Sequence, residues 1–200
     1  AGSMGLECLP QLQLPDGSWS FDHTQCPQCR GQCGNPGDLG NARNGATAMA
    51  LLPFLGAGQT HLEGKYQKQV KAGLYFLVSK MVVDPSKGGS LFESGGSMYS
   101  HGLAAITLCE AWGMTQDKGL RNPAQLAINF ICWAQDPAAG GWRYSPRKGG
   151  DTSVVGWQIM ALKSGHMSYL TVPPVTVQNA YRYLTSVQAN NGANYGYTTP

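Results

Sequence analysis

The stretch Gln135-Asp136-Pro137-Ala138-Ala139-Gly140-Gly141-Trp142 decides the fold of this 200-residue chain. It places a glutamine before a glycine turn and a tryptophan just after it. Gln13 to Trp19 repeats the arrangement, and so does Gln188 to Gly192 with Tyr195 in place of the tryptophan. A fourth copy has Lys80 at the glutamine position and Gly89–Phe92 for the turn and ring. From Lys80 onward the copies are 55 and 53 residues apart, and the first spacing, 67 residues, is longer by about 13. Such a near-constant interval predicts a helical repeat architecture.

Each copy separates two kinds of predicted helix. The preceding segments are amphipathic and share a small residue followed by an aromatic and an aliphatic one; they are residues 71–77, 125–131 and 179–184, and 5–9 with Cys8 at the aromatic position. The following segments, residues 45–58, 100–113 and 152–165, are apolar nearly all round and close on a glycine. Helices of this kind are buried on all sides. We therefore predict an all-α domain over residues 4–200, with an inner and an outer row of helices. An ordinary helical bundle that repeats is the alternative.

The two strongest copies, Gln13-x3-Gly17-x-Trp19 and Gln135-x4-Gly140-x-Trp142, resemble the QW motif of squalene-hopene and oxidosqualene cyclases. The resemblance implies the α/α-toroid of the terpenoid cyclase and protein prenyltransferase superfamily. In that motif the glutamine caps a neighbouring helix end and the tryptophan packs over the turn. Only three complete helix pairs are counted, which predicts a partial barrel. An open arc exposes apolar inner helices, and closure by a homodimer is one expected solution.

The catalytic motifs of that superfamily are degenerate here. Hopene-type cyclases carry Asp-x-Asp-Asp-Thr-Ala at the start of an inner helix, whereas this chain has Lys148–Ser153, in which only Asp151 and Thr152 match. The proton-donating aspartate is absent, which argues against cyclase chemistry. Met98–His101 lies near the position of the prenyltransferase zinc motif and lacks its Asp-x-Cys pair. A prenyl or terpenoid enzyme is therefore the least favoured function.

A cysteine-rich knuckle is inserted in the first repeat, at residues 22–36. It contains His23, Cys26, Cys29 and Cys33. Cys-x2-Cys with nearby proline and glycine directs two sulfurs to one side, and these four residues form a tetrahedral Zn²⁺ ligand set. His61 or Asp22 is an alternative to His23. The competing interpretation is one disulfide and one free cysteine. A closed site would be structural, and one with three protein ligands would activate water.

Polar residues gather at the predicted starts of the inner helices. Matching the closing glycines places Asn44, Tyr99 and Asp151 at one level, and His101 and Ser153 at the next but one. Helix N-termini favour anions, so this rim is a candidate site. His101 and Asp151 are candidates for a base and its orienting group, with Ser100 as a hydrolytic nucleophile. The alternative is that Ser100 and Asp151 only cap helices and that His101 is a buried hydrogen-bonding residue.

The remaining candidate substrate-binding residues are Arg43 and Trp157, beside Asn44, Tyr99 and Ser153. The favoured function is a toroid-type module without cyclase chemistry that binds an apolar small molecule or a protein partner at the inner ring. The alternative is a zinc-dependent hydrolase of esters or phosphoesters, using the knuckle or the His101/Asp151 rim.

Composition narrows the functional classes. A net charge of +3 with scattered basic residues gives no basic patch for nucleic acid. No run approaches the ~18 apolar residues of a membrane span. Cys8, Cys109 and Cys132 fall in apolar helical patterns, which is unlike a disulfide framework. The cysteines thus favour a reducing compartment or metal-protected thiols.

Overall fold

The structure, a computed structural model, describes residues 2–22, 24 and 37–200. Within those ranges it is mostly helical, which confirms the predicted all-α class. The α-helices are α1 (Gly2–Cys8), α2 (Arg43–Gly56), α3 (Gln67–Lys80), α4 (Ser97–Thr115), α5 (Lys118–Ala134), α6 (Thr152–Met167) and α7 (Pro174–Ser186). The short elements are the 3₁₀ helices η1 (Leu9–Leu12) and η3 (Asn190–Gly192), and the strands β1 (Val82–Asp84), β2 (Gly88–Ser90), β3 (Gln188–Ala189) and β4 (Asn194–Tyr195).

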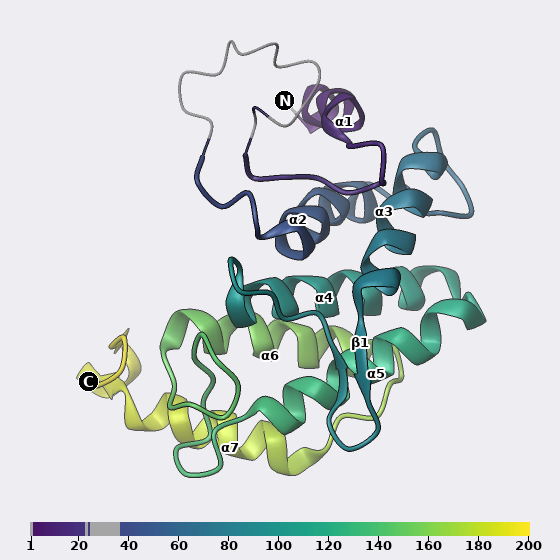
Figure 1. The fold of residues 1–200 in the computed structure, drawn as a ribbon. Helices are drawn as coiled ribbons and strands as arrows, with labels where there is room; N and C mark the ends of the chain where they lie inside the picture. The colour runs from purple at the N-terminus through teal and green to yellow at the C-terminus, as the bar shows by residue number, and fades with distance from the viewer. Residues whose placement is uncertain (1, 23, 25–36) are drawn as a thin grey trace.

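The apolar helices α2, α4 and α6 pack on one another in chain order, with α4 in the middle (Figure 1). Each amphipathic helix packs against the apolar helix of its neighbourhood: α3 on α2, α5 on both α4 and α6, and α7 on α6. Burial follows this division, since 13 of the 19 residues of α4 are buried, whereas α7 buries only three of its 13. The buried apolar residues form one core that extends from Trp19 to Val187.

The apolar helices run parallel to each other. The Gln158 amide donates to Met98 O near the start of α4, and Ser168, just after α6, donates to Cys109 O in the second half of α4. Between α2 and α4, Gly45 lies against Ser100 near the start of both helices, and Thr107 Oγ1 donates to Ala48 O farther along. Gly102 of α4 lies under α6, because a Cβ there would come within 2.7 Å of the Gln158 amide nitrogen. A residue without a side chain is therefore what allows the close approach of the two helices.

The two glutamine–tryptophan stretches make matching links. The Gln135 side chain donates to Gly140 O and to Thr176 O in the first turn of α7, both at 2.9 Å. Gln13 donates in the same way to Gly17 O and to Gln69 O of α3. The ring nitrogens of Trp142 and Trp19 each donate at 2.8 Å to a carbonyl of the preceding helical segment, Ile131 O and Leu9 O. These bonds fix each amphipathic segment to its turn and to the next amphipathic helix.

The turn glycines explain why the repeat cannot vary at one point. Gly17, Gly88 and Gly140 all have positive φ, and a Cβ on them would lie 2.6, 2.6 and 2.4 Å from the backbone oxygens of Ala72, Leu126 and Asn179. Each turn is thus pressed onto the backbone of the next amphipathic helix. The three carbonyls therefore occupy equivalent places in α3, α5 and α7.

In the second copy the link is an antiparallel hairpin, β1–β2, with Val82 opposite Ser90. The sequence analysis did not predict this hairpin, or the two-residue pairing of β3 with β4. It also placed the turn glycine one residue late, since Gly88 rather than Gly89 has the positive φ and the backbone contact. Lys80 is the last residue of α3. Among the hydrogen bonds of the described residues, its side chain makes none that corresponds to those of Gln135.

A second series of contacts sets the register of the apolar helices. The backbone N–H groups of Asn44, Met98 and Thr152, spaced 54 residues apart, bind oxygen atoms of the following turn: the Glu93 carboxylate, Tyr144 O and Tyr197 O. Asp151 is also the N-cap of α6 and accepts from Val154 N at 2.9 Å, as predicted for a capping residue. Asn44 and Ser100 lie inside their helices, which begin after Ala42 and Gly96.

We expect Gly156→Ala to stabilise the protein by about 0.5–1 kcal/mol, because an interior helical glycine is costly and a Cβ here meets no atom within 4 Å. Gly102→Ala is the matched control, since Gly102 occupies the equivalent place in α4 but is covered by Gln158. In thermal unfolding followed by circular dichroism, the first variant should have a higher Tm than the parent protein and the second a lower one. A lowered Tm for Gly156→Ala would show that this face of α6 is not open.

Candidate functional site

An apolar face runs across α2, α4 and α6. The register set by Asn44, Met98 and Thr152 brings two sets of equivalent residues into rows. We call these six residues the apolar face; they are Met49, Leu103 and Trp157 in the first row and Leu52, Ile106 and Met160 in the second. On the two end helices, α2 and α6, the side chains of Met49 and Met160 are 46% and 45% exposed. On the middle helix α4, Leu103 and Ile106 are nearly covered.

Two hollows lie along this face and share Trp157. The first, about 540 Å³, is bounded by Met49, Leu103 and Trp157 together with Tyr99 and Tyr144. The second, about 420 Å³, is bounded by residues of the second row and by Lys163 and Ser164. The residues that line both hollows are largely apolar. Concave apolar surfaces with a few polar groups at one end are typical of small-molecule sites.

A short chain of hydrogen bonds starts at Tyr99, which lines the first hollow. Tyr99 and Ser153 hydroxyls are 2.5 Å apart, and Ser153 Oγ donates to Asp151 Oδ1 at 2.8 Å. Because the single Ser153 proton goes to the carboxylate, the Tyr99 hydroxyl must donate to Ser153. The Tyr99 oxygen then keeps its lone pairs for another donor. Tyr99, Ser153 and Asp151 are three of the residues that the sequence singled out, and the structure brings them together.

Asp151 is fully buried at the start of α6. Its Oδ1 accepts from Val154 N and from Ser153 Oγ. Its Oδ2 is buried with no hydrogen-bond partner among the described residues. The N-terminus of α6 stabilises the negative charge of this carboxylate. Asp151 therefore serves as the anchor of the Tyr99–Ser153 chain and as a helix cap.

His101 does not meet Asp151, which corrects the predicted pairing of base and orienting group. Its Nδ1 accepts from Leu91 N at 3.1 Å, and its Nε2 donates to Ala127 O at 3.1 Å, a tautomer that the N–H donor fixes. The ring is fully buried and packs on Phe130. Burial lowers the pKa of His101 to about 4, the Ala127 carbonyl opposing the shift. His101 thus joins the turn before α4 to α5.

Thr47 shows that this role belongs to the repeat. Its Oγ1 accepts from Trp19 N at 3.0 Å, and Thr47 precedes His101 by 54 residues. Ser100 is 1% exposed, and a Cβ on Gly45 would lie 2.5 Å from its hydroxyl oxygen, so it lies where α2 meets α4, at the wall of the first hollow. The described residues therefore do not assemble Ser100, His101 and Asp151 into a hydrolytic set.

Arg43 and Asn44 are bonded within the chain. Arg43 forms an ion pair with Asp16 at 3.0 Å and contacts the Ser18 hydroxyl. The backbone N–H groups of Asn44 and Gly45 each bind one oxygen of Glu93 at 3.0 Å. The Asn44 side chain donates to Leu91 O. Trp157 alone among the remaining predicted binding residues lines both hollows.

The sequence analysis missed most of the apolar face, although a signal for it was present. Met49, Leu103, Leu52, Ile106 and Met160 are plain apolar residues in helices assigned to the core. Their common spacing of 54 residues would have grouped them once the register was known. Glu93 was also missed, because nothing in its local sequence indicates that it caps α2 from the following turn.

The predicted zinc ligands His23, Cys26, Cys29 and Cys33 lie outside the described residues. Across residues 2–22, 24 and 37–200, no three His, Cys, Asp or Glu side chains are grouped for a metal ion. The alternative ligand His61 pairs through Nε2 with Asp117 at 2.8 Å, and Asp22 accepts from Thr24 at 2.6 Å. Zinc in the knuckle stays a prediction.

The other three cysteines are free thiols. Cys109 is buried, and burial raises its pKa to about 12. Cys132 is half-buried, with its pKa raised for the same reason, while Cys8 is exposed and so is not the core residue that the sequence predicted. Along the described parts of the chain, no helix has the length and apolar character needed to cross a bilayer.

No family model matches the chain, and no curated protein matches it.

Proposed function

We propose that the chain is a toroid-type module that binds an apolar small molecule on the apolar face, without cyclase chemistry. The parallel α2, α4 and α6 correspond to an inner ring of such a fold, and α1, α3, α5 and α7 to its outer ring. The observation that carries the proposal is the pair of equivalent apolar rows, bordered by two hollows that meet at Trp157. Burying such a surface is favourable by about 25 cal/mol per Å².

The polar end defines the ligand more closely. Tyr99 lines the first hollow, and its oxygen can accept a hydrogen bond from a ligand because its proton is committed to Ser153. A ligand that fits has a long apolar body and one hydroxyl or amine donor at its end. Of the residues assigned a catalytic role, Ser100 lines the first hollow, whereas the buried His101 and Asp151 do not, so neither of these two stands there as a general base. Binding without turnover is the function that these groups support.

Dodecanol is a suitable probe, and we expect saturable binding with a negative heat-capacity change by isothermal titration calorimetry. Met49→Glu should weaken binding about tenfold or more, because a carboxylate in the apolar face opposes the alkyl chain. Tyr75→Glu is the matched control, since Tyr75 is an exposed aromatic residue on α3. Equal effects of the two variants, or no saturable binding, would reject the proposal.

Tyr99→Phe tests the polar end separately. It removes one hydroxyl while keeping the ring, so dodecanol affinity should fall about 2–10-fold, the value of one hydrogen bond. Dodecane affinity should not change, because the alkane donates no hydrogen bond. A matching loss for alkane and alcohol would mean that Tyr99 contributes only packing.

A further inference from the structure

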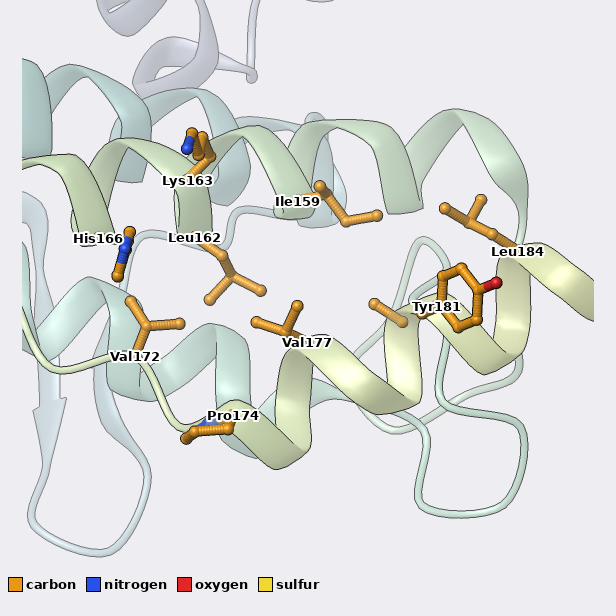
Figure 2. A pocket seen from close by; sticks show the side chains of 10 residues that line it. Ile159, Leu162, Lys163, His166, Val172, Pro174, Val177, Tyr181 and Leu184 are labelled. Carbon is orange, nitrogen blue, oxygen red and sulfur yellow. The ribbon is translucent and has the colours of Figure 1, made fainter.

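The last helix pair, α6 and α7, has an open groove. In the preceding pair, α4 and α5, the equivalent surface is covered by α6. The groove lies between α6 and α7 and has a volume of about 460 Å³. Figure 2 shows Leu162 of α6 and Val177 of α7 facing each other across it, and Ile159 and Tyr181 also line it. Its walls are mainly aliphatic, with Lys163 and His166 toward the end of α6.

The repeat contacts identify what covers the equivalent surface elsewhere. Leu126 and Asn179 have equivalent carbonyls under the turn glycines, so residues two before and two after them correspond. Ala124 and Ile128 of α5 are both fully buried, whereas their counterparts Val177 and Tyr181 are 49% and 73% exposed. The helix that covers this surface of α5 is α6, because a Cβ on Gly165 would lie 2.9 Å from Ile128 Cδ1.

The α6 side of the groove gives the same comparison. Gly102 of α4 is covered by Gln158 of α6, while Gly156, 54 residues later, has no atom within 4 Å of a Cβ. Cys109 of α4 is fully buried, and the residue at the equivalent place in α6 is Lys163. Both walls of the groove are therefore the continuation of an interface that already exists between α6 and the α4–α5 pair.

We propose that this groove binds one partner α-helix, apolar over most of its surface, lying parallel to α6 and carrying a carboxylate toward its C-terminal end. The parallel direction follows from the α4–α6 contacts. The carboxylate follows from Lys163 and His166, the basic side chains that line the groove toward the end of α6. The α4 helix of a folded second copy is not free to enter the groove, since it is buried between α2 and α6.

A peptide of residues 97–115 with a neutral polyethylene glycol tag is the probe, because it is apolar and carries Glu110 near its C-terminal end. We expect it to bind the full chain in fluorescence anisotropy. Val177→Asp should weaken this binding at least tenfold. Val175→Asp is the matched control, because Val175 is 58% exposed on the same helix and does not line the groove. A Glu110→Lys peptide should bind more weakly by a factor that shrinks as salt rises.

Three outcomes would overturn the proposal. The first is no binding by a peptide that is helical in solution, and the second is equal loss with the two valine variants. The third is a dimer of the free chain that Val177→Asp dissociates in analytical ultracentrifugation, since this would assign the groove to a second copy. Circular dichroism of both variants checks that each is folded, which their exposed positions on α7 favour.

Discussion

Gly140→Ala is expected to destabilise the protein by about 2–5 kcal/mol. Two costs add. The φ of Gly140 is +84°, which an L-residue adopts at a cost of about 1–2 kcal/mol. The new Cβ would also lie 2.4 Å from Asn179 O, so the turn must move away from α7, at about 1–3 kcal/mol for overpacking. That movement also stretches the bond from Gln135 to Thr176.

Gly149→Ala separates the two costs. Gly149 also has a positive φ, +47°, but a Cβ there meets nothing within 4 Å. Urea unfolding of both variants should give Gly149→Ala only the conformational cost, and Gly140→Ala a further loss of about 1–3 kcal/mol. Equal losses would mean that the turn does not press on α7. Gly17→Ala should repeat the result at α3, where the contact is with Ala72.

The same contact explains why the fold class was predictable from so short a stretch. A glutamine, a glycine at positive φ and a tryptophan each have a role that few other residues perform, so their spacing is visible in the sequence. Gln135 and Trp142 donate side-chain hydrogen bonds that tie three segments together. The copy at Lys80 has lost these donors, and its β1–β2 hairpin could not be inferred from what remained.

The candidate site was harder to predict because its register depends on tertiary contacts. Matching the closing glycines placed Asn44, Tyr99 and Asp151 at one level, whereas the bound N–H groups are those of Asn44, Met98 and Thr152. Helix ends vary by a residue or two, so a glycine is a poor reference point. A shift of one residue rotates a helical side chain by about 100°. Because of this shift, the sequence indicated polar residues that hold the repeats together as the candidate site, and not the apolar face.

His101 is the clearest case of that error, and its burial leads to a second large effect. We expect protonation of His101 to cost about 3 kcal/mol of stability between pH 7 and pH 4. The usual pKa of 6.5 applies to the unfolded chain, and burial lowers the folded value to about 4. Between these values the unfolded state binds a proton that the folded state does not. The stability from neutral His101 is therefore complete above pH 6.5 and is lost as the pH falls toward 4.

His101→Gln should remove this part of the pH dependence while losing some stability at pH 7, because an amide can still accept from Leu91 N and donate to Ala127 O without titrating. Urea unfolding at pH 7, 5.5 and 4 measures the difference from the parent protein, which cancels the contribution of other groups. His166→Gln, at the exposed C-terminal end of α6, is the control. If the His101→Gln protein loses as much stability in acid as the parent, proton uptake at His101 is not what destabilises the fold.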